Sequence, residues 1–290
     1  MTIKKLTVIS GKGGTGKTTV ISNLAALADN VVLGDCDVDA PNMHLLLKPT
    51  VEKKTVFKSA KLAVKNEDSC NNCGLCREFC RFKAINEDLS INPLKCDGCG
   101  VCAVVCPSNV IHLEEQITGH IYHSNSRFGP MIHAKLKAGA DNSGKLVSEV
   151  KKEAAKTAIE QNKKLILIDG SPGIGCPVIA SLNGVDMALV VTEPTQSGLA
   201  DLVRVLGLSK HFNIQVFIVI NKYDLNEKMT AEINKYCQEK GISVIGKIPF
   251  SREINEAMHL GKLIVNYKPA AKPAVAIRDM WQKVKEINQL

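Results

Sequence analysis

Near its amino terminus the chain carries the segment Leu6-Thr7-Val8-Ile9-Ser10-Gly11-Lys12-Gly13-Gly14-Thr15-Gly16-Lys17-Thr18-Thr19. Its second part satisfies the pattern G-x-x-x-x-G-K-S/T, and it lies between an apolar run typical of a strand and a helical pattern. Glycines let successive backbone N–H groups point at phosphate oxygens, and the helix N-terminus that follows adds partial positive charge. We therefore expect Lys17 to reach the β- and γ-phosphates of a nucleotide and the Thr18 hydroxyl to ligate Mg²⁺. The residues expected to bind the nucleotide are Gly11, Lys12, Gly13, Gly14, Thr15, Gly16, Lys17, Thr18 and Thr19.

Outward from this loop, strand and helix patterns alternate along much of the chain. Strands separated by helices form right-handed βαβ units, so we predict an α/β fold with a mainly parallel sheet and helices on both faces. Strands are expected at Val31–Asp35, Leu165–Asp169, Met187–Thr192, Ile214–Asn221 and Ser243–Ile248. Helices are expected at Thr18–Ala28, Lys145–Glu160, Gly198–Ser209, Lys228–Lys240, Ile254–Leu260 and Ala274–Asn288.

The alternating pattern breaks after Leu47, where the sequence becomes rich in Cys, Asn, Asp and Lys. Short hairpin-like pieces, Lys83–Ile85 and Leu89–Ile91, lie in this stretch. We predict a discontinuous P-loop domain of residues 1–50 and 118–290, interrupted by an inserted domain of residues 51–117.

Composition limits the function classes. The formal net charge of +8 by itself invites a nucleic-acid interpretation, but only 4% of residues are aromatic, which argues against a base-stacking nucleic-acid surface. We therefore expect no specific nucleic-acid partner. Apolar runs have the length of strands and are far too short to span a membrane. Because the amino terminus runs straight into a strand and lacks a signal-peptide pattern, we expect a cytoplasmic protein.

Eight of the eleven cysteines lie between Cys70 and Cys106 in two runs of C-x₂-C-x₂-C-x₃-C. This spacing is that of bacterial two-cluster ferredoxins, in which the fourth cysteine of each run ligates the other cluster. Paired zinc sites are the alternative for such cysteines. Arg81 stands where proline usually follows the fourth cysteine, whereas Pro107 keeps that proline. We expect two [4Fe-4S] clusters, one on Cys70, Cys73, Cys76 and Cys106, the other on Cys96, Cys99, Cys102 and Cys80.

The additional lysine, Lys12, makes the phosphate loop resemble the deviant Walker A loop of the MinD/ParA/nitrogenase-iron-protein superfamily. The resemblance implies an ATP-dependent homodimer in which Lys12 touches the phosphates bound by the partner. It also implies that Asp37, in the switch I segment 35–39, orients the attacking water. Asp169, in the switch II segment 169–173, would be the Walker B carboxylate. The catalytic residues expected on this basis are Lys12, Lys17, Asp37 and Asp169.

The segment Asn221-Lys222-Tyr223-Asp224 matches the guanine-reading pattern of GTPases superficially. In the resembling superfamily the asparagine at this strand end contacts adenine instead, and Pro249 would close the other side of the base. We therefore favour ATP over GTP.

The remaining cysteines, Cys36, Cys176 and Cys237, are expected to pack as small apolar residues. Around the return from the cysteine-rich stretch lie histidines 112, 120, 123 and 133, and segments 119–123 and 127–133 alternate like a hairpin. We expect these histidines either to lie on the surface or pack on the sheet, or to form a docking surface for a redox or cluster-receiving protein.

Three functions compete. The first is an ATP-driven switch in which nucleotide state governs electron transfer or redox-partner docking. The second is an iron–sulfur cluster assembly or delivery ATPase similar to the Mrp-type carriers, although their carboxy-terminal Cys-x-x-Cys is absent here. The third is a positioning ATPase similar to MinD or ParA. It would use the apolar face of the last helix on a membrane, a face that usually packs in a core.

Overall fold

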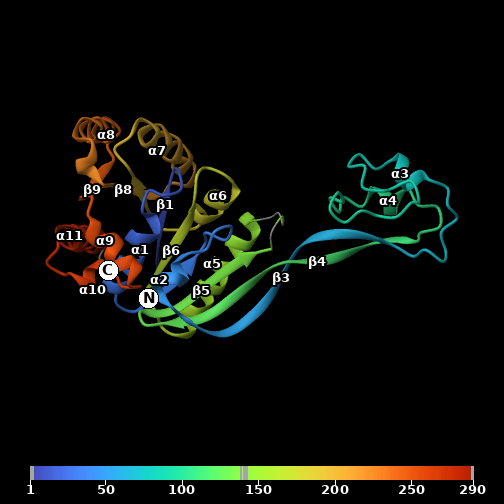
Figure 1. Cartoon of the computed structure of the whole chain (residues 1–290), viewed down its shortest axis with the longest axis horizontal. Helices are drawn as coiled ribbons and strands as arrows, with labels where there is room; N and C mark the ends of the chain where they lie inside the picture. Colours follow the sequence, from blue (N-terminus) through green and yellow to red (C-terminus); the bar gives the residue numbers. More distant parts are fainter. Residues whose placement is uncertain (1–2, 138, 140–142, 289–290) are drawn as a thin grey trace. The chain divides into compact units, whose positions relative to one another are not determined.

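The computed structural model describes residues 3–137, 139 and 143–288. The chain divides into two compact units (Figure 1). The nucleotide unit comprises the described residues of Met1–Thr55, Ile121–Lys135 and Ser143–Leu290. The cysteine unit comprises those of Val56–His120 and Leu136–Asn142. The predicted domain boundaries at residues 51 and 117 stay predictions.

The nucleotide unit is built on parallel strands in the order β5-β2-β6-β1-β7-β8-β9. Each neighbouring pair in this order is parallel. The predicted α/β class with a mainly parallel sheet is therefore confirmed. The strands are β1 (Lys4–Ser10), β2 (Val31–Asp35), β5 (Gly129–Leu136), β6 (Leu165–Pro172), β7 (Met187–Thr192), β8 (Gln215–Asn221) and β9 (Ser243–Ile248).

Helices cover both faces of this sheet (Figure 1). One core holds residues of α1, α10 and α11, such as Leu24 and Trp281, and the other holds residues of α6, α7 and α8, such as Leu202 and Ile233. The long helices start and end within a few residues of the predicted positions, whereas the short α2, α6 and α10 were not predicted. The helices are α1 (Lys17–Leu27), α2 (Met43–Leu47), α5 (Ser143–Glu160), α6 (Cys176–Leu182), α7 (Gln196–Ser209), α8 (Glu227–Glu239), α9 (Arg252–His259), α10 (Ile264–Tyr267) and α11 (Lys272–Asn288).

The apolar face of α11 packs inside the protein. Ile277, Met280 and Val284 are at most 1% exposed, and Trp281 donates its indole N–H to the Leu27 carbonyl at 3.1 Å. This favours core packing over membrane contact for this face. Within the part of the chain that the structure describes, no helix combines the length and apolarity that crossing a membrane requires.

Two long strands, β3 (Thr50–Lys65) and β4 (Ile111–Ser126), each contain residues of both units. In the sheet order, β3 neighbours β4 and β4 neighbours β5. The alternation of residues 119–123 and 127–133 thus correctly indicated two neighbouring strands. β3 was missed because its first half carries exposed lysines and glutamate and lacks an apolar run.

The cysteine unit contains two short helices, α3 (Leu75–Glu78) and α4 (Val101–Val104). Each begins after a glycine in the left-handed region, Gly74 at φ 78° and Gly100 at φ 82°. An antiparallel bridge joins Ile85 to Ile91, where the short hairpin was predicted. Six buried residues, one of them Cys76, form its small core, and other cysteines of both runs pack against it.

Candidate nucleotide and metal sites

The phosphate loop connects β1 to α1 and needs glycine at particular points. Gly14 and Gly16 have φ of 82° and 89°, which side chains rarely tolerate. A Cβ at Gly16 would also lie 2.3 Å from Asn221 Nδ2. The loop lines a cavity of about 790 Å³ together with Asp37 and Asp39. This is room enough for a nucleotide's phosphates.

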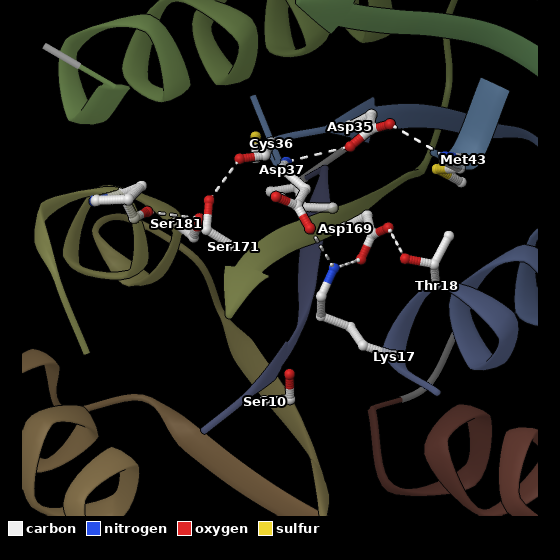
Figure 2. Close-up of polar contacts among 12 residues, drawn as sticks. Ser10, Lys17, Thr18, Asp35, Cys36, Asp37, Met43, Asp169, Ser171 and Ser181 are labelled. Atoms are coloured by element: carbon white, nitrogen blue, oxygen red, sulfur yellow. Dashed lines mark hydrogen bonds and ion pairs between the residues drawn. The ribbon is translucent and has the colours of Figure 1, made fainter. Parts of the chain in front are cut away.

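Lys17 joins the two aspartates predicted from the switch segments (Figure 2). Its Nζ lies 2.5 Å from Asp169 Oδ1 and 3.5 Å from Asp37 Oδ2. Thr18 Oγ1 donates to the other oxygen of Asp169 at 2.8 Å. Burial lowers the pKa of Lys17, but the carboxylates of Asp169 and Asp37 outweigh it and the pKa is raised. Lys17, Thr18, Asp37 and Asp169 thus form one group, and its hydroxyl and carboxylate oxygens are the donors that Mg²⁺ prefers.

Asp35 is a buried acid of this site to which sequence reasoning assigned no role. Its carboxylate accepts hydrogen bonds from the backbone N–H of Asp37 at 3.1 Å and of Met43 at 3.3 Å. Burial and, next, the charge of Asp169 raise its pKa well above the usual range. Asp35 therefore holds the Asp37 loop against α2. The sequence feature that could have indicated a role for Asp35 is its position at the end of a strand. The parallel register places it there beside Asp169.

The two switch segments are also connected directly (Figure 2). The Ser171 hydroxyl donates to the Cys36 carbonyl at 2.7 Å, and the Cys36 N–H donates to the Asp169 carbonyl at 2.8 Å. Ser171 and Cys36 are both buried. A shift of one segment therefore requires the other to move or to break these bonds.

Lys12 is held within its own chain in this structure. Its Nζ donates to Ser197 Oγ at 2.9 Å and lies 3.8 Å from a Glu193 oxygen. The side chain remains 34% exposed. The contact with a partner's phosphates stays a prediction.

A second pocket of about 200 Å³ adjoins the phosphate loop. Its lining includes Gly14, Gly16, Asn221, Pro249 and Phe250. The Asn221 amide donates to the Thr15 carbonyl at 2.8 Å, which fixes the loop against the end of β8. The structure thus brings Asn221 and Pro249, both predicted from sequence, to one pocket beside the loop.

The other two polar residues of the Asn221–Asp224 motif have partners within the chain. Asp224 accepts a hydrogen bond from the Phe250 N–H at 2.7 Å, and Lys222 Nζ lies 2.5 Å from Glu193 Oε1. Asp224 therefore fixes the turn around Pro249.

In the cysteine unit, Cys80 lies with three cysteines of the second run. One pocket is lined by Cys80, Cys96, Cys99 and Cys102, together with Ile91 and other residues. Of the first run, Cys76 is buried; burial raises its thiol pKa, and the nearby Cys73 and Cys70 add to the rise. Cys106 packs against the unit's core.

Among the described residues, no three or more His, Cys, Asp or Glu side chains are close enough to hold a single metal ion. Sulfurs on one zinc ion lie at most about 3.8 Å apart, given Zn–S bonds of about 2.3 Å. In a four-iron cluster each of the four thiolates binds a different iron atom, so the ligand sulfurs lie farther apart than those around one zinc ion.

The remaining cysteines and histidines occupy varied surroundings. Cys36 and Cys237 are buried, and Cys176 is exposed at the start of α6. His133 is buried, accepts or donates a hydrogen bond with Ser124 Oγ at 3.0 Å, and stacks on Tyr122. Burial lowers its pKa to about 4. For His133, packing in the sheet is therefore the correct alternative.

A parallel sheet with a phosphate loop and two carboxylates at its strand ends defines a P-loop nucleotide-binding protein. The chain belongs to the CbiA family, the CobQ/CobB/MinD/ParA nucleotide binding domain, whose model matches residues 6–264. It is 34% identical over 287 residues to an uncharacterized protein of Methanocaldococcus jannaschii, covering 98% of this chain and 97% of that protein.

Two further similarities concern proteins with informative names. The iron-sulfur cluster carrier protein of Pyrococcus horikoshii is 26% identical over 306 residues, covering 98% of this chain and 88% of that protein. The structure of MinD complexed with Mg-ADP from Pyrococcus horikoshii aligns with a TM-score of 0.60 at 19% identity, covering 99% and 98% of the two chains. The latter likeness shows a shared MinD-like fold.

Proposed function

We propose that this chain is an ATP-hydrolysing iron–sulfur protein in which nucleotide state controls electron transfer or redox-partner docking through two [4Fe-4S] clusters. The observation that carries the proposal is the grouping of Cys80 with Cys96, Cys99 and Cys102 in a chain that also holds a phosphate loop. A cysteine from the first run among three of the second is the arrangement that crossed ligation requires.

In the nucleotide unit, each residue of the site has a role that follows from its position. Lys17 would bind the β- and γ-phosphates, and Thr18 and Asp169 would hold Mg²⁺ directly or through water. Asp37, on the loop braced by Asp35, would orient the water that attacks the γ-phosphate. ATP is favoured over GTP because the superfamily that the phosphate loop resembles uses the asparagine at this strand end for adenine. In addition, one oxygen of Asp224, the carboxylate that would read guanine, accepts the Phe250 N–H.

In the cysteine unit, the donor set fits iron–sulfur clusters. The pocket of Cys80, Cys96, Cys99 and Cys102 is otherwise lined largely by apolar residues such as Ile85 and Ile91, which limits access of water to bound sulfide. When bound, each cluster supplies one-electron redox chemistry. The thiolates hold the clusters, and the backbone N–H of Ala84 donates to Cys80 Sγ at 3.4 Å, a contact of the kind that tunes potential.

Coupling between the two activities would begin at switch I. Asp35 binds the backbone of Met43 at the start of α2, and β3 begins at Thr50, three residues after the end of α2. Because β3 continues into the cysteine unit, a change in the Asp37 loop on loss of the γ-phosphate would pass along a short covalent path.

A homodimer would complete the switch. In this structure Lys12 is paired with Glu193 and Ser197. We propose that ATP draws Lys12 away from these partners to the phosphates of a second copy, so that dimerisation reports the nucleotide state. Lys12→Ala should then weaken ATP-dependent dimerisation in analytical ultracentrifugation.

A second candidate function is cluster assembly or delivery. The observation that favours it is the similarity to proteins named iron-sulfur cluster carriers. Complete ligation of each cluster by four cysteines opposes easy release. Incubation with an apo-ferredoxin separates the candidates, because a carrier should transfer iron and sulfide in a nucleotide-dependent way and an electron-transfer switch should not.

Redox titrations of the anaerobically purified protein test the leading proposal. We expect a different potential or EPR line shape for at least one cluster with an ATP analogue than with ADP. By linkage, reduction should then change the relative affinity for ATP and ADP by the same free energy. Coincident titrations without nucleotide, with ADP and with the analogue would overturn intrinsic coupling and leave partner docking as the controlled step.

A further inference from the structure

The two halves of the cysteine unit repeat one another with an offset of 26 residues. The Asn66 N–H donates to the Val110 carbonyl at 2.9 Å, and 26 residues later the Asn92 N–H donates to the Ala84 carbonyl at 2.7 Å. In each case the donor precedes the first cysteine of a run by four residues, and the acceptor follows a fourth cysteine by four. The helices α3 and α4 and the glycines that precede them, Gly74 and Gly100, are also 26 residues apart.

Lys65 and Ile91 occupy equivalent positions in this repeat, because Lys65 directly precedes Asn66 and Ile91 directly precedes Asn92. Ile91 lines the pocket of Cys80, Cys96, Cys99 and Cys102. The repeat therefore assigns Lys65 to the equivalent surroundings, those of Cys70, Cys73, Cys76 and Cys106. Where one half has an apolar side chain, the other half has a lysine.

The Lys65 side chain is buried, at 3% exposure. Its Nζ lies 2.8 Å from Glu67 Oε2, but no acceptor among the described residues meets this nitrogen in hydrogen-bonding geometry. Glu67 itself is 67% exposed, so water weakens its attraction. The contact with Glu67 raises the pKa of Lys65, and the neighbouring Cys70 and Cys76 raise it further. A buried ammonium with one ion-pair partner has N–H groups left to donate to a further acceptor, such as a sulfur.

We propose that Lys65 makes the two clusters unequal, with its ammonium facing the cluster on Cys70, Cys73, Cys76 and Cys106 and raising that cluster's reduction potential. The proposal rests on the proposed function, since it requires both clusters. Reduction adds one electron and therefore one negative charge, which a buried cation stabilises far more than an apolar Ile91 does. If both clusters are bound, the cysteines Cys70, Cys73, Cys76 and Cys106 would hold the one that accepts the first electron from a one-electron donor, with no bond made or broken.

The test is an EPR-monitored redox titration of the holo-protein. Wild type should show two separate one-electron steps. In Lys65→Met the higher potential should fall toward the lower one, while Lys65→Arg should keep the separation. Ile91→Lys should raise the lower potential instead.

Lys95→Met is the matched control. Lys95 directly precedes Cys96 but is exposed, so its loss should leave both potentials nearly unchanged. An unchanged higher potential in Lys65→Met, at about eight iron atoms per chain, would overturn the inference and leave the proposed function standing. If Lys65→Met does not retain iron, Ile91→Lys decides, and an unchanged lower potential in that variant overturns the inference. Wild type that binds no iron after anaerobic reconstitution would instead overturn the proposed function.

Discussion

The nucleotide unit and the cysteine unit differ in what holds them together. The first has extensive buried cores on both faces of a parallel sheet, and its charged site is braced by direct contacts such as Lys17 to Asp169. The second has a core of six buried residues, one of which is Cys76, and it has cysteines where a larger domain would have apolar side chains. The nucleotide site is thus added to a fold that is stabilised elsewhere, whereas the cysteine residues make up much of the structure of the second unit.

The largest expected effect follows from this difference. Removing iron should unfold the cysteine unit and leave the nucleotide unit folded, because a small core without metal does not offset the entropy of ordering the chain. Hydrogen exchange with mass spectrometry on reconstituted and chelator-treated protein measures both units at once. Protection should be lost across residues 56–120 and kept in β1, β6 and β7. Equal protection in the two samples would contradict the comparison.

Changes at the phosphate site should alter function without unfolding. Lys17→Ala should weaken ATP binding by about 100-fold, since it removes a charged contact with the phosphates worth roughly 3 kcal/mol. Asp37→Ala should bind ATP normally and lose turnover by about two orders of magnitude, because Asp37 acts chiefly when water attacks. Fluorescent-nucleotide titration and phosphate release separate the two. Normal hydrolysis by Asp37→Ala would show that the switch I assignment is wrong.

Crossed ligation makes a sharper prediction within the cysteine unit. Cys80→Ala should damage the cluster on Cys96, Cys99 and Cys102 and leave the cluster on the remaining cysteines of its own run. Cys106→Ala, the matched variant, should do the reverse. Iron analysis together with EPR of each variant distinguishes the clusters by their potentials. Loss of the cluster on Cys70, Cys73 and Cys76 in Cys80→Ala would rule out the crossed arrangement.

Much of the fold was predictable because local patterns carry it. The buried strands are continuous apolar runs, and β7 and β9 begin and end at the predicted residues. The candidate site was only partly predictable. Lys17 and Asp169 come from motifs. The place of Asp35 at a strand end was a signal, but its role also depends on strand register and on its hydrogen bond from Met43, which the sequence does not specify. Lys65 could have been found by aligning the two cysteine runs, although its burial could not.

The smallest expected effect concerns His133, a buried group of the nucleotide unit. Its pKa is lowered to about 4, from an ordinary value near 6.5, because burial disfavours the charged ring and His44 lies nearby. Below about pH 6.5 the unfolded state therefore binds more protons than the folded state. Stability should fall as pH drops from 6.5 toward 4, by about 1–3 kcal/mol in total from this residue. Burial also raises the pKa of Asp35 and Asp37, so wild type must be compared with a variant. His133→Asn is a suitable variant because its amide can still hydrogen-bond Ser124, although the ring stacking on Tyr122 is lost.

The His133→Asn variant should be less stable than wild type at pH 7 and lose less stability between pH 6.5 and 4.5 in urea unfolding. Parallel pH profiles for the two proteins would show that His133 is not protonated on unfolding in this range.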